Sequence, residues 1–166
     1  MIKKILKVLV LIIAVGVVII QFFRIDKANP VIVDNETLEA AIAVSPDVGL
    51  IMGRSCNDCH SHKTVYPWYS NVQPVAWWLK DHIEEARDEL NFSRFNTYQT
   101  KKKAKKLEEL CEEVREGNMP LPSYLWGHSE AVLSENDKNT LCDWANAERA
   151  KIAGNGERKE DGEADH

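Results

Sequence analysis

The stretch "SCNDCHSHKTVYPWYS" at residues 55–70 places Cys56 and Cys59 three positions apart, with His60 directly after the second cysteine. On one turn of helix, residues three apart project from the same side, so both thiols and the imidazole can act on one bound group. Three uses fit this local chemistry: covalent attachment of a c-type haem, half of a zinc site, or a dithiol redox pair. Each use requires different features elsewhere in the chain.

A long apolar segment lies near the amino terminus. No polar side chain occurs from Val8 to Ile20, and three lysines precede it. About 20 apolar residues cross a bilayer, and no small-residue cleavage site follows Phe23. We therefore expect residues 1–24 to form an uncleaved, single-pass transmembrane helix rather than a signal peptide. The preceding lysines place the amino terminus in the cytoplasm and the rest of the chain at the extracytoplasmic (periplasmic) side of the cell membrane.

Beyond a linker at residues 25–34, the sequence predicts an all-α domain at residues 35–152. Apolar side chains recur at helical spacing in four segments, and capping residues flank them. Ser45-Pro46 should end the first segment, Gly117 lies just past the third, and Ser134 with Asp137 resembles a capping box before the fourth. These segments are residues 36–44, 75–90, 101–116 and 135–149. The only β-like run is residues 31–33, so the strand–helix–strand pattern expected around a thioredoxin-like dithiol is missing from the sequence. Residues 153–166 are polar, and we expect them to form a disordered tail.

The two remaining cysteines, Cys111 and Cys142, are single residues on separate predicted helices. A structural zinc site needs four ligands and usually draws them from closely spaced pairs, so these cysteines complete such a site poorly. In an oxidising compartment they form a candidate disulfide that closes a loop of 142 − 111 = 31 residues. A buried free thiol at Cys111 is the alternative.

Covalent haem attachment uses every residue of the motif at 56–60. In this interpretation Cys56 and Cys59 add to the vinyl groups of one haem c, and His60 binds the iron from the proximal side. The attachment takes place outside the cytoplasm, where the predicted topology puts the domain. The alternative is a chance occurrence of the pattern in a disulfide-bonded domain.

Three longer segments carry a resemblance to a known family. They are "SCNDCHSHKTVYPWYSNVQPVAWWLKDHIEEARDELNFS", "EGNMPLPSYLWGH" and "LCDWA", in this order along the chain. Together they resemble the bacterial haem-binding domain family of small cytochrome c-like proteins, which often have an amino-terminal membrane segment. The resemblance extends from about Ile51 to Ala147. It implies a cytochrome c-like helical domain around a haem held by Cys56, Cys59 and His60, and it supplies no known partner.

The distal iron ligand has to be sought outside the motif. Met52 lies four residues before Cys56, on the attachment side, whereas Met119 precedes Pro120 in a segment that proline keeps extended. We therefore expect Met119 to bind the iron from the distal side. The alternatives are that Met119 only fills a gap in the core, or that His82, at the margin of an apolar helix face, is the ligand.

The expected ligands point to a function in electron transfer. A Met/His pair raises the reduction potential of a haem relative to two histidines, and a saturated iron favours electron transfer over ligand binding. We expect a membrane-tethered cytochrome that exchanges electrons with another redox protein and is not an enzyme. A peroxidase-like haem enzyme, or a gas or redox sensor with an exchangeable sixth ligand, is the alternative. The formal net charge of −5 argues against nucleic acid as a partner.

Overall fold

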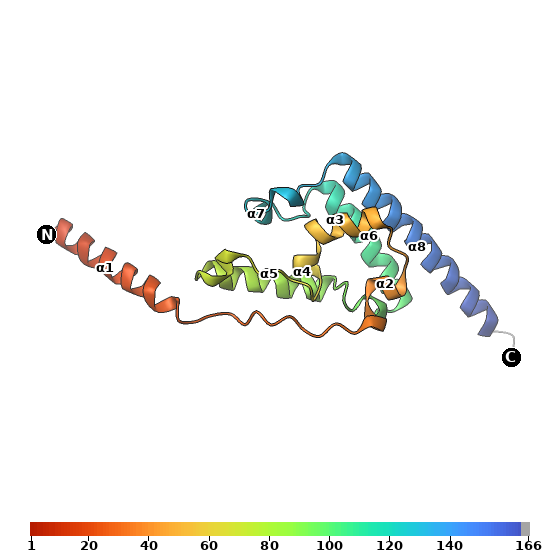
Figure 1. Cartoon of the computed structure of the whole chain (residues 1–166), viewed down its shortest axis with the longest axis horizontal. Helices are drawn as coiled ribbons and strands as arrows, with labels where there is room; N and C mark the ends of the chain where they lie inside the picture. Colours follow the sequence, from red (N-terminus) through yellow and green to blue (C-terminus); the bar gives the residue numbers. More distant parts are fainter. Residues whose placement is uncertain (164–166) are drawn as a thin grey trace.

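The computed structural model describes the backbone of residues 1–163 and the side chains of residues 1–154. Within the described backbone there are helices and no strands (Figure 1), so the predicted all-α class is confirmed. The α-helices are α1 (Ile2–Ile20), α2 (Leu38–Ala41), α3 (Pro46–Ser55), α4 (Asn57–His60), α5 (Val75–Glu89), α6 (Thr100–Glu116), α7 (Pro122–Leu125) and α8 (Glu135–Glu163). Short 3-10 helices are η1 (Asp34–Glu36), η2 (Trp68–Asn71), η3 (Phe95–Thr97) and η4 (Ser129–Ala131).

The hydrophobic core forms where α6 and α8 pack against each other and against α2 and α3 (Figure 1). A disulfide between Cys111 of α6 and Cys142 of α8 joins the two long helices. The buried core side chains are Leu38, Val48, Ile51, Met52, Phe92, Phe95, Leu107, Val114, Leu141 and Ala145. The core therefore sets the positions of α3 and of the segment that follows α6.

Helix α5 lies outside this core, and α4 lies beside it (Figure 1). In this view α3 and α7 lie above α5. It packs on α4 and η2. Arg87 of α5 donates from Nε to the carbonyl of Ser61 at 2.9 Å and from Nη2 to Thr64 Oγ1 at 2.9 Å. These bonds hold the loop that follows the Cys56–His60 motif against α5.

The helix boundaries follow local capping chemistry. Ser134 and Asp137 form the expected capping box at the start of α8, with Ser134 N–H donating to Asp137 Oδ2 at 2.8 Å and Asp137 N–H donating to Ser134 Oγ at 3.2 Å. Gly117 ends α6 in the left-handed region, with φ of 78°. Both features are those that the sequence predicts.

The segment at residues 36–44 differs from its prediction. Only Leu38–Ala41 is α-helical, and Thr37 caps it by accepting from Ala40 N–H at 3.3 Å. The sequence treats Ser45-Pro46 as a helix stop. In the structure it begins α3, because Ser45 accepts from Val48 N–H at 3.4 Å and proline suits the first turn of a helix.

The structure does not support the predicted transmembrane helix at residues 1–24. Among the residues that the structure describes, no helix is both long enough and apolar enough to cross a membrane. Helix α1 ends at Ile20, and its first turns contain Lys3, Lys4 and Lys7.

The chain after α1 follows the domain surface along α5 (Figure 1). The Gln21 side chain donates to the carbonyl of Gln73 at 3.0 Å and accepts from Gln73 N–H at 2.9 Å. Trp77 Nε1 donates to the carbonyl of Phe23 at 2.9 Å. The exit from α1 is therefore bound to the amino-terminal end of α5.

The carboxyl-terminal segment also differs from its prediction. Residues 153–166 are expected to be a disordered tail, whereas α8 continues to Glu163. Adding residues to an existing helix costs far less than starting one. Residues 164–166 lie outside the described part of the chain.

The Cys111–Cys142 disulfide should contribute to stability. Replacing both cysteines with alanine should lower the free energy of unfolding by about 3 to 4 kcal/mol, because it frees a 31-residue loop in the unfolded chain. Denaturant titration of the wild type and the double variant measures this difference. Reducing agent should destabilise only the wild type, and equal stability of the two proteins would contradict the expectation.

Candidate functional site

The Cys56–His60 motif consists of Cys56, at the junction of α3 and α4, and the single turn of α4 itself. Cys56 ends α3 and begins α4, and its carbonyl accepts from Cys59 N–H at 3.2 Å and from His60 N–H at 3.0 Å. Both cysteines are free thiols. The turn therefore brings two thiols and one imidazole to the same short stretch of backbone.

The two thiols are in an environment that disfavours the thiolate. Burial, reinforced by Cys59, raises the pKa of Cys56 to about 12. Burial and the charge of Asp58 raise the pKa of Cys59 to about 11. A reactive redox dithiol needs a lowered pKa, so this geometry does not favour the dithiol interpretation.

Zinc is not supported either. The described part of the chain contains no group of three or more His, Cys, Asp or Glu side chains arranged to hold a metal ion. Cys111 and Cys142, the only other cysteines, are bonded to each other.

His60 is oriented by the carboxyl-terminal end of α5. Its Nδ1 lies 2.9 Å from the carbonyl oxygen of Leu90 and 3.1 Å from that of Ala86. Because carbonyl oxygens only accept, Nδ1 carries the proton and Nε2 keeps its lone pair. Burial lowers the pKa of His60, which keeps the ring neutral. A neutral imidazole whose second nitrogen is held by a carbonyl is the typical arrangement of a metal-binding histidine.

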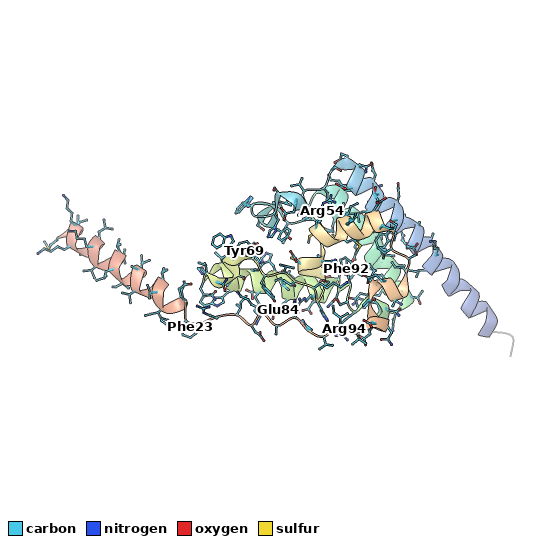
Figure 2. All side chains as sticks on the ribbon, in the orientation of Figure 1. Phe23, Arg54, Tyr69, Glu84, Phe92 and Arg94 are labelled. Atoms are coloured by element: carbon cyan, nitrogen blue, oxygen red, sulfur yellow. A yellow bond between two sulfur atoms is a disulfide. The ribbon has the colours of Figure 1, made fainter. Side chains whose placement is uncertain are left out.

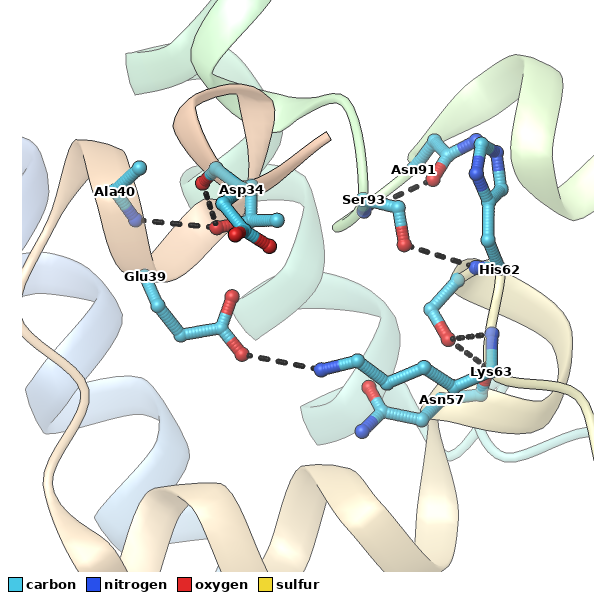
Figure 3. A network of polar contacts seen from close by, with 10 residues as sticks. Asp34, Glu39, Ala40, Asn57, His62, Lys63, Asn91 and Ser93 are labelled. Carbon is cyan, nitrogen blue, oxygen red and sulfur yellow. Dashed lines mark hydrogen bonds and ion pairs between the residues drawn. The ribbon is translucent and has the colours of Figure 1, made fainter. Parts of the chain in front are cut away.

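A polar network behind the motif holds the loop that follows it (Figure 3). Ser61 Oγ donates to the carbonyl of Asn57 at 2.6 Å and accepts from Lys63 N–H at 2.9 Å. His62 N–H donates to Ser93 Oγ at 2.9 Å. Phe92 N–H donates to the carbonyl of His60 at 2.8 Å. Two successive residues after α5, Phe92 and Ser93, therefore bind the end of the motif and the loop that follows it.

Met119 is positioned by the end of α6. After Gly117 the chain turns back, and Asn118 N–H and Met119 N–H both donate to the carbonyl of Glu113, at 3.0 Å and 3.1 Å. Pro120 is buried, while the Met119 side chain is only partly buried. The thioether is therefore held at the surface of the core, on the α7 side.

An apolar groove connects His60 with Met119. A cavity of about 570 Å³ adjoins one of about 240 Å³, and Cys56, His60 and Met119 line both. The apolar side chains around the larger cavity are Leu90, Phe92, Leu110, Val114, Pro120 and Leu133. A third cavity of about 420 Å³ continues from Cys59 toward the aromatic end of α7. The two larger volumes lie in the range of ~300–1,000 Å³ that is typical of small-molecule sites.

His82, the alternative ligand, also lines this groove. Its Nδ1 lies 2.9 Å from the carbonyl oxygen of Trp78, and its ring lies 4.2 Å from the Trp78 ring. However, His82 belongs to α5, the helix whose carbonyls hold His60. Met119 belongs to the segment between α6 and α7, and α7 lies apart from α5 in Figure 1.

The segment that forms this groove matches a known protein family. The family model of the haem-binding domain matches residues 15–147, which is most of the chain. The chain belongs to the haem-binding domain family. No curated protein and no solved structure matches it. The matched segment contains the Cys56–His60 motif and Met119.

The residues of this haem-binding domain fit a haem. The groove is mostly apolar, as a porphyrin requires, although charged side chains such as Glu89 and Lys106 also line it. It contains two thiols, the imidazoles of His60 and His82, and one thioether. His60 and Met119 come from different segments of the chain, α4 and the loop between α6 and α7, and both line the same two cavities. These residues would therefore hold the cofactor, and the rest of the groove would enclose its ring.

Two hydrogen-bonded pairs of residues around the groove are not indicated by the sequence. Tyr124 Oη donates to Asp58 Oδ2, inside the motif, at 2.8 Å. Ser55 Oγ donates to the carbonyl of Ala131 at 3.0 Å. Asp58 stands between the two cysteines in sequence, but nothing in the sequence identifies its partner, which is 66 residues away.

Proposed function

We propose that this domain holds one haem c covalently through Cys56 and Cys59, with His60 and Met119 as the iron ligands, and that it carries electrons. The observation that carries the proposal is the placement of His60 and Met119 on one groove. His60 Nδ1 is occupied by the carbonyls of Leu90 and Ala86, which leaves Nε2 for iron. Met119 lines the same two cavities as His60.

The contribution of the bound cofactor is a reversible one-electron change at iron. The protein sets the conditions for it. A thioether ligand opposite an imidazole stabilises the reduced iron and raises its potential. The hydrogen bonds to His60 raise the basicity of the imidazole and fix its orientation. With both axial positions filled, the site favours electron exchange with another redox protein over the binding of a small substrate.

The compartment forms a second part of the proposal. We infer that the domain works outside the cytoplasm, in the periplasm. The bonded pair Cys111 and Cys142 supports this inference, since structural disulfides persist in oxidising compartments. Covalent attachment of haem to the Cys56–His60 motif would take place in the same compartment.

Covalent attachment has a direct test. The full chain, produced with a cytochrome c maturation system, should keep its haem stain on a denaturing gel. The Cys56→Ala/Cys59→Ala variant should lose the stain, because no thioether can form. The matched control is Cys111→Ala/Cys142→Ala, which should keep it. A wild-type chain that contains zinc and no haem would exclude the proposal.

The amino-terminal helix leads to a proposal about membrane attachment. None of the α1 side chains is buried in the protein, and Val8–Ile20 contains no charge. We propose that α1 attaches the domain to a membrane. The full chain should then fractionate with membranes, and a chain without residues 1–24, exported by a cleavable signal, should be soluble and contain haem. Recovery of the full chain in the soluble fraction would contradict this.

The distal ligand can be identified by substitution. The oxidised wild type should show the weak near-infrared band of sulfur-ligated haem, and the reduced wild type should bind CO slowly. Met119→Ala should remove the band, allow rapid CO binding and lower the potential, because the thioether stabilises the reduced iron.

His82→Ala is the matched control, and it should leave the band in place. If His82→Ala changes the spectrum and Met119→Ala does not, the haem has two histidine ligands. If the wild type binds CO rapidly and neither variant matters, the sixth position is open, and an enzyme or sensor role takes the place of electron transfer.

A further inference from the structure

Residues 118–131, which we call the distal strap, cross from the end of α6 to the start of α8. At its first end, Asn118 and Met119 donate to the carbonyl of Glu113. At its last end, the carbonyl of Glu130 accepts from Arg54 Nε at 3.0 Å, and that of Ala131 accepts from Ser55 Oγ at 3.0 Å. The strap is therefore fixed at both ends to helices of the core.

Between these ends, one hydrogen bond joins the strap to the attachment motif in the part of the chain that the structure describes. Tyr124 Oη donates to Asp58 Oδ2 at 2.8 Å, while Asp58 Oδ1 accepts from Val65 N–H at 2.9 Å. Burial, reinforced by the charge of Asp58, raises the pKa of Tyr124 well above its usual range. The phenol therefore remains a donor at every physiological pH, and the carboxylate is held from both oxygens.

Aromatic contacts reinforce this position. The Tyr124 ring stacks on the His128 ring, with centroids 4.1 Å apart and an angle of 8° between the planes. Tyr69 Oη lies 3.0 Å from His128 Nε2. Tyr69 belongs to η2 (Figure 2), so the middle of the strap contacts both the motif and the segment that precedes α5.

The position of Tyr124 bears on Met119 through the backbone between them. Of the four intervening residues, Pro120 and Pro122 have a fixed φ, so a displacement of one end is passed to the other. One way for the thioether to leave the groove is for the first half of the strap to move away from α4. That movement stretches the Tyr124–Asp58 hydrogen bond, which lies on the same side.

We propose that Tyr124 is a positioning residue that, through its hydrogen bond to Asp58, keeps Met119 on the iron and closes the sixth position to other ligands. This inference rests on the proposed function, because it presupposes Met119 as the distal ligand. The inference makes the Tyr124–Asp58 hydrogen bond a determinant of ligand exchange. The acceptor of this bond, Asp58, belongs to the attachment motif and is not one of the proposed iron ligands. The two ends of the strap limit the movement, and the Tyr124–Asp58 bond sets how often it occurs.

The test compares the haem-loaded full chain with its Tyr124→Phe variant. Imidazole is titrated into the oxidised protein, and loss of the near-infrared sulfur band reports displacement of Met119. A hydrogen bond to a charged group is worth about a factor of ten, so Tyr124→Phe should bind imidazole about tenfold more tightly. CO binding to the reduced variant should be faster by a similar factor. Far-UV circular dichroism checks that the variant is folded.

Tyr66→Phe is the matched control. It removes the same hydroxyl from a phenol that makes no hydrogen bond in the described structure, and it should behave as wild type. Asp58→Ala should have an effect as large as Tyr124→Phe, and the double variant should show little more than either single one.

Two results would overturn the inference, and they are distinguishable. If Met119→Ala opens the iron while Tyr124→Phe behaves as Tyr66→Phe, Tyr124 does not position the ligand, and the proposed function stands. The same conclusion follows if the effects of Asp58→Ala and Tyr124→Phe simply add. If Met119→Ala leaves the near-infrared region unchanged, the proposed ligand set itself is wrong.

Discussion

The hydrogen bonds from His60 Nδ1 to the carbonyls of Leu90 and Ala86 are the interaction on which the site depends. They join the attachment motif to α5, a helix outside the α6–α8 core. The Leu90 carbonyl lies just past the end of α5 and is available for a side-chain donor, whereas the Ala86 carbonyl accepts from Leu90 N–H as well as from His60. The same bonds fix the tautomer, direct Nε2 away from α5 and set the direction from which any iron ligand must approach. The groove on the Nε2 side of His60, which Met119 also lines, is where such a ligand would lie.

Much of the fold could be predicted because its signals are local. Helices α5 and α6 and the start of α8 combine apolar spacing with caps such as Ser134, Asp137 and Gly117, each of which acts within a few residues. Helix α3 was missed because Ser45-Pro46 both terminates one segment and begins the next, and sequence alone does not separate the two roles. The predicted transmembrane helix failed on charge, since three lysines lie inside α1.

The candidate site divides in the same way. The Cys56–His60 motif is contiguous, and methionine is so scarce in this chain that Met119 could be chosen by elimination. The bonds of Tyr124 to Asp58 and of Ser55 to Ala131 connect residues 66 and 76 positions apart. No periodicity or spacing indicates such pairs, because they depend on how α3, α4 and the distal strap pack in three dimensions. The supports of the ligands are therefore less predictable than the ligands themselves.

The two proposed iron ligands depend on different parts of the protein. His60 is oriented by α5, whereas Met119 is held by the end of α6 and hence by the disulfide-bonded core. Direct contact between α5 and that core is slight: α5 packs on α4 and η2, and Glu89 reaches α6 through an ion pair with Lys106, at 3.1 Å, in which the Glu89 side chain is exposed. Such surface pairs contribute little to stability. A ligand bound on both sides of the groove would therefore join the two parts, and by mass action it would stabilise their native arrangement. In this architecture the cofactor acts as a structural element between α5 and the core as well as a redox centre.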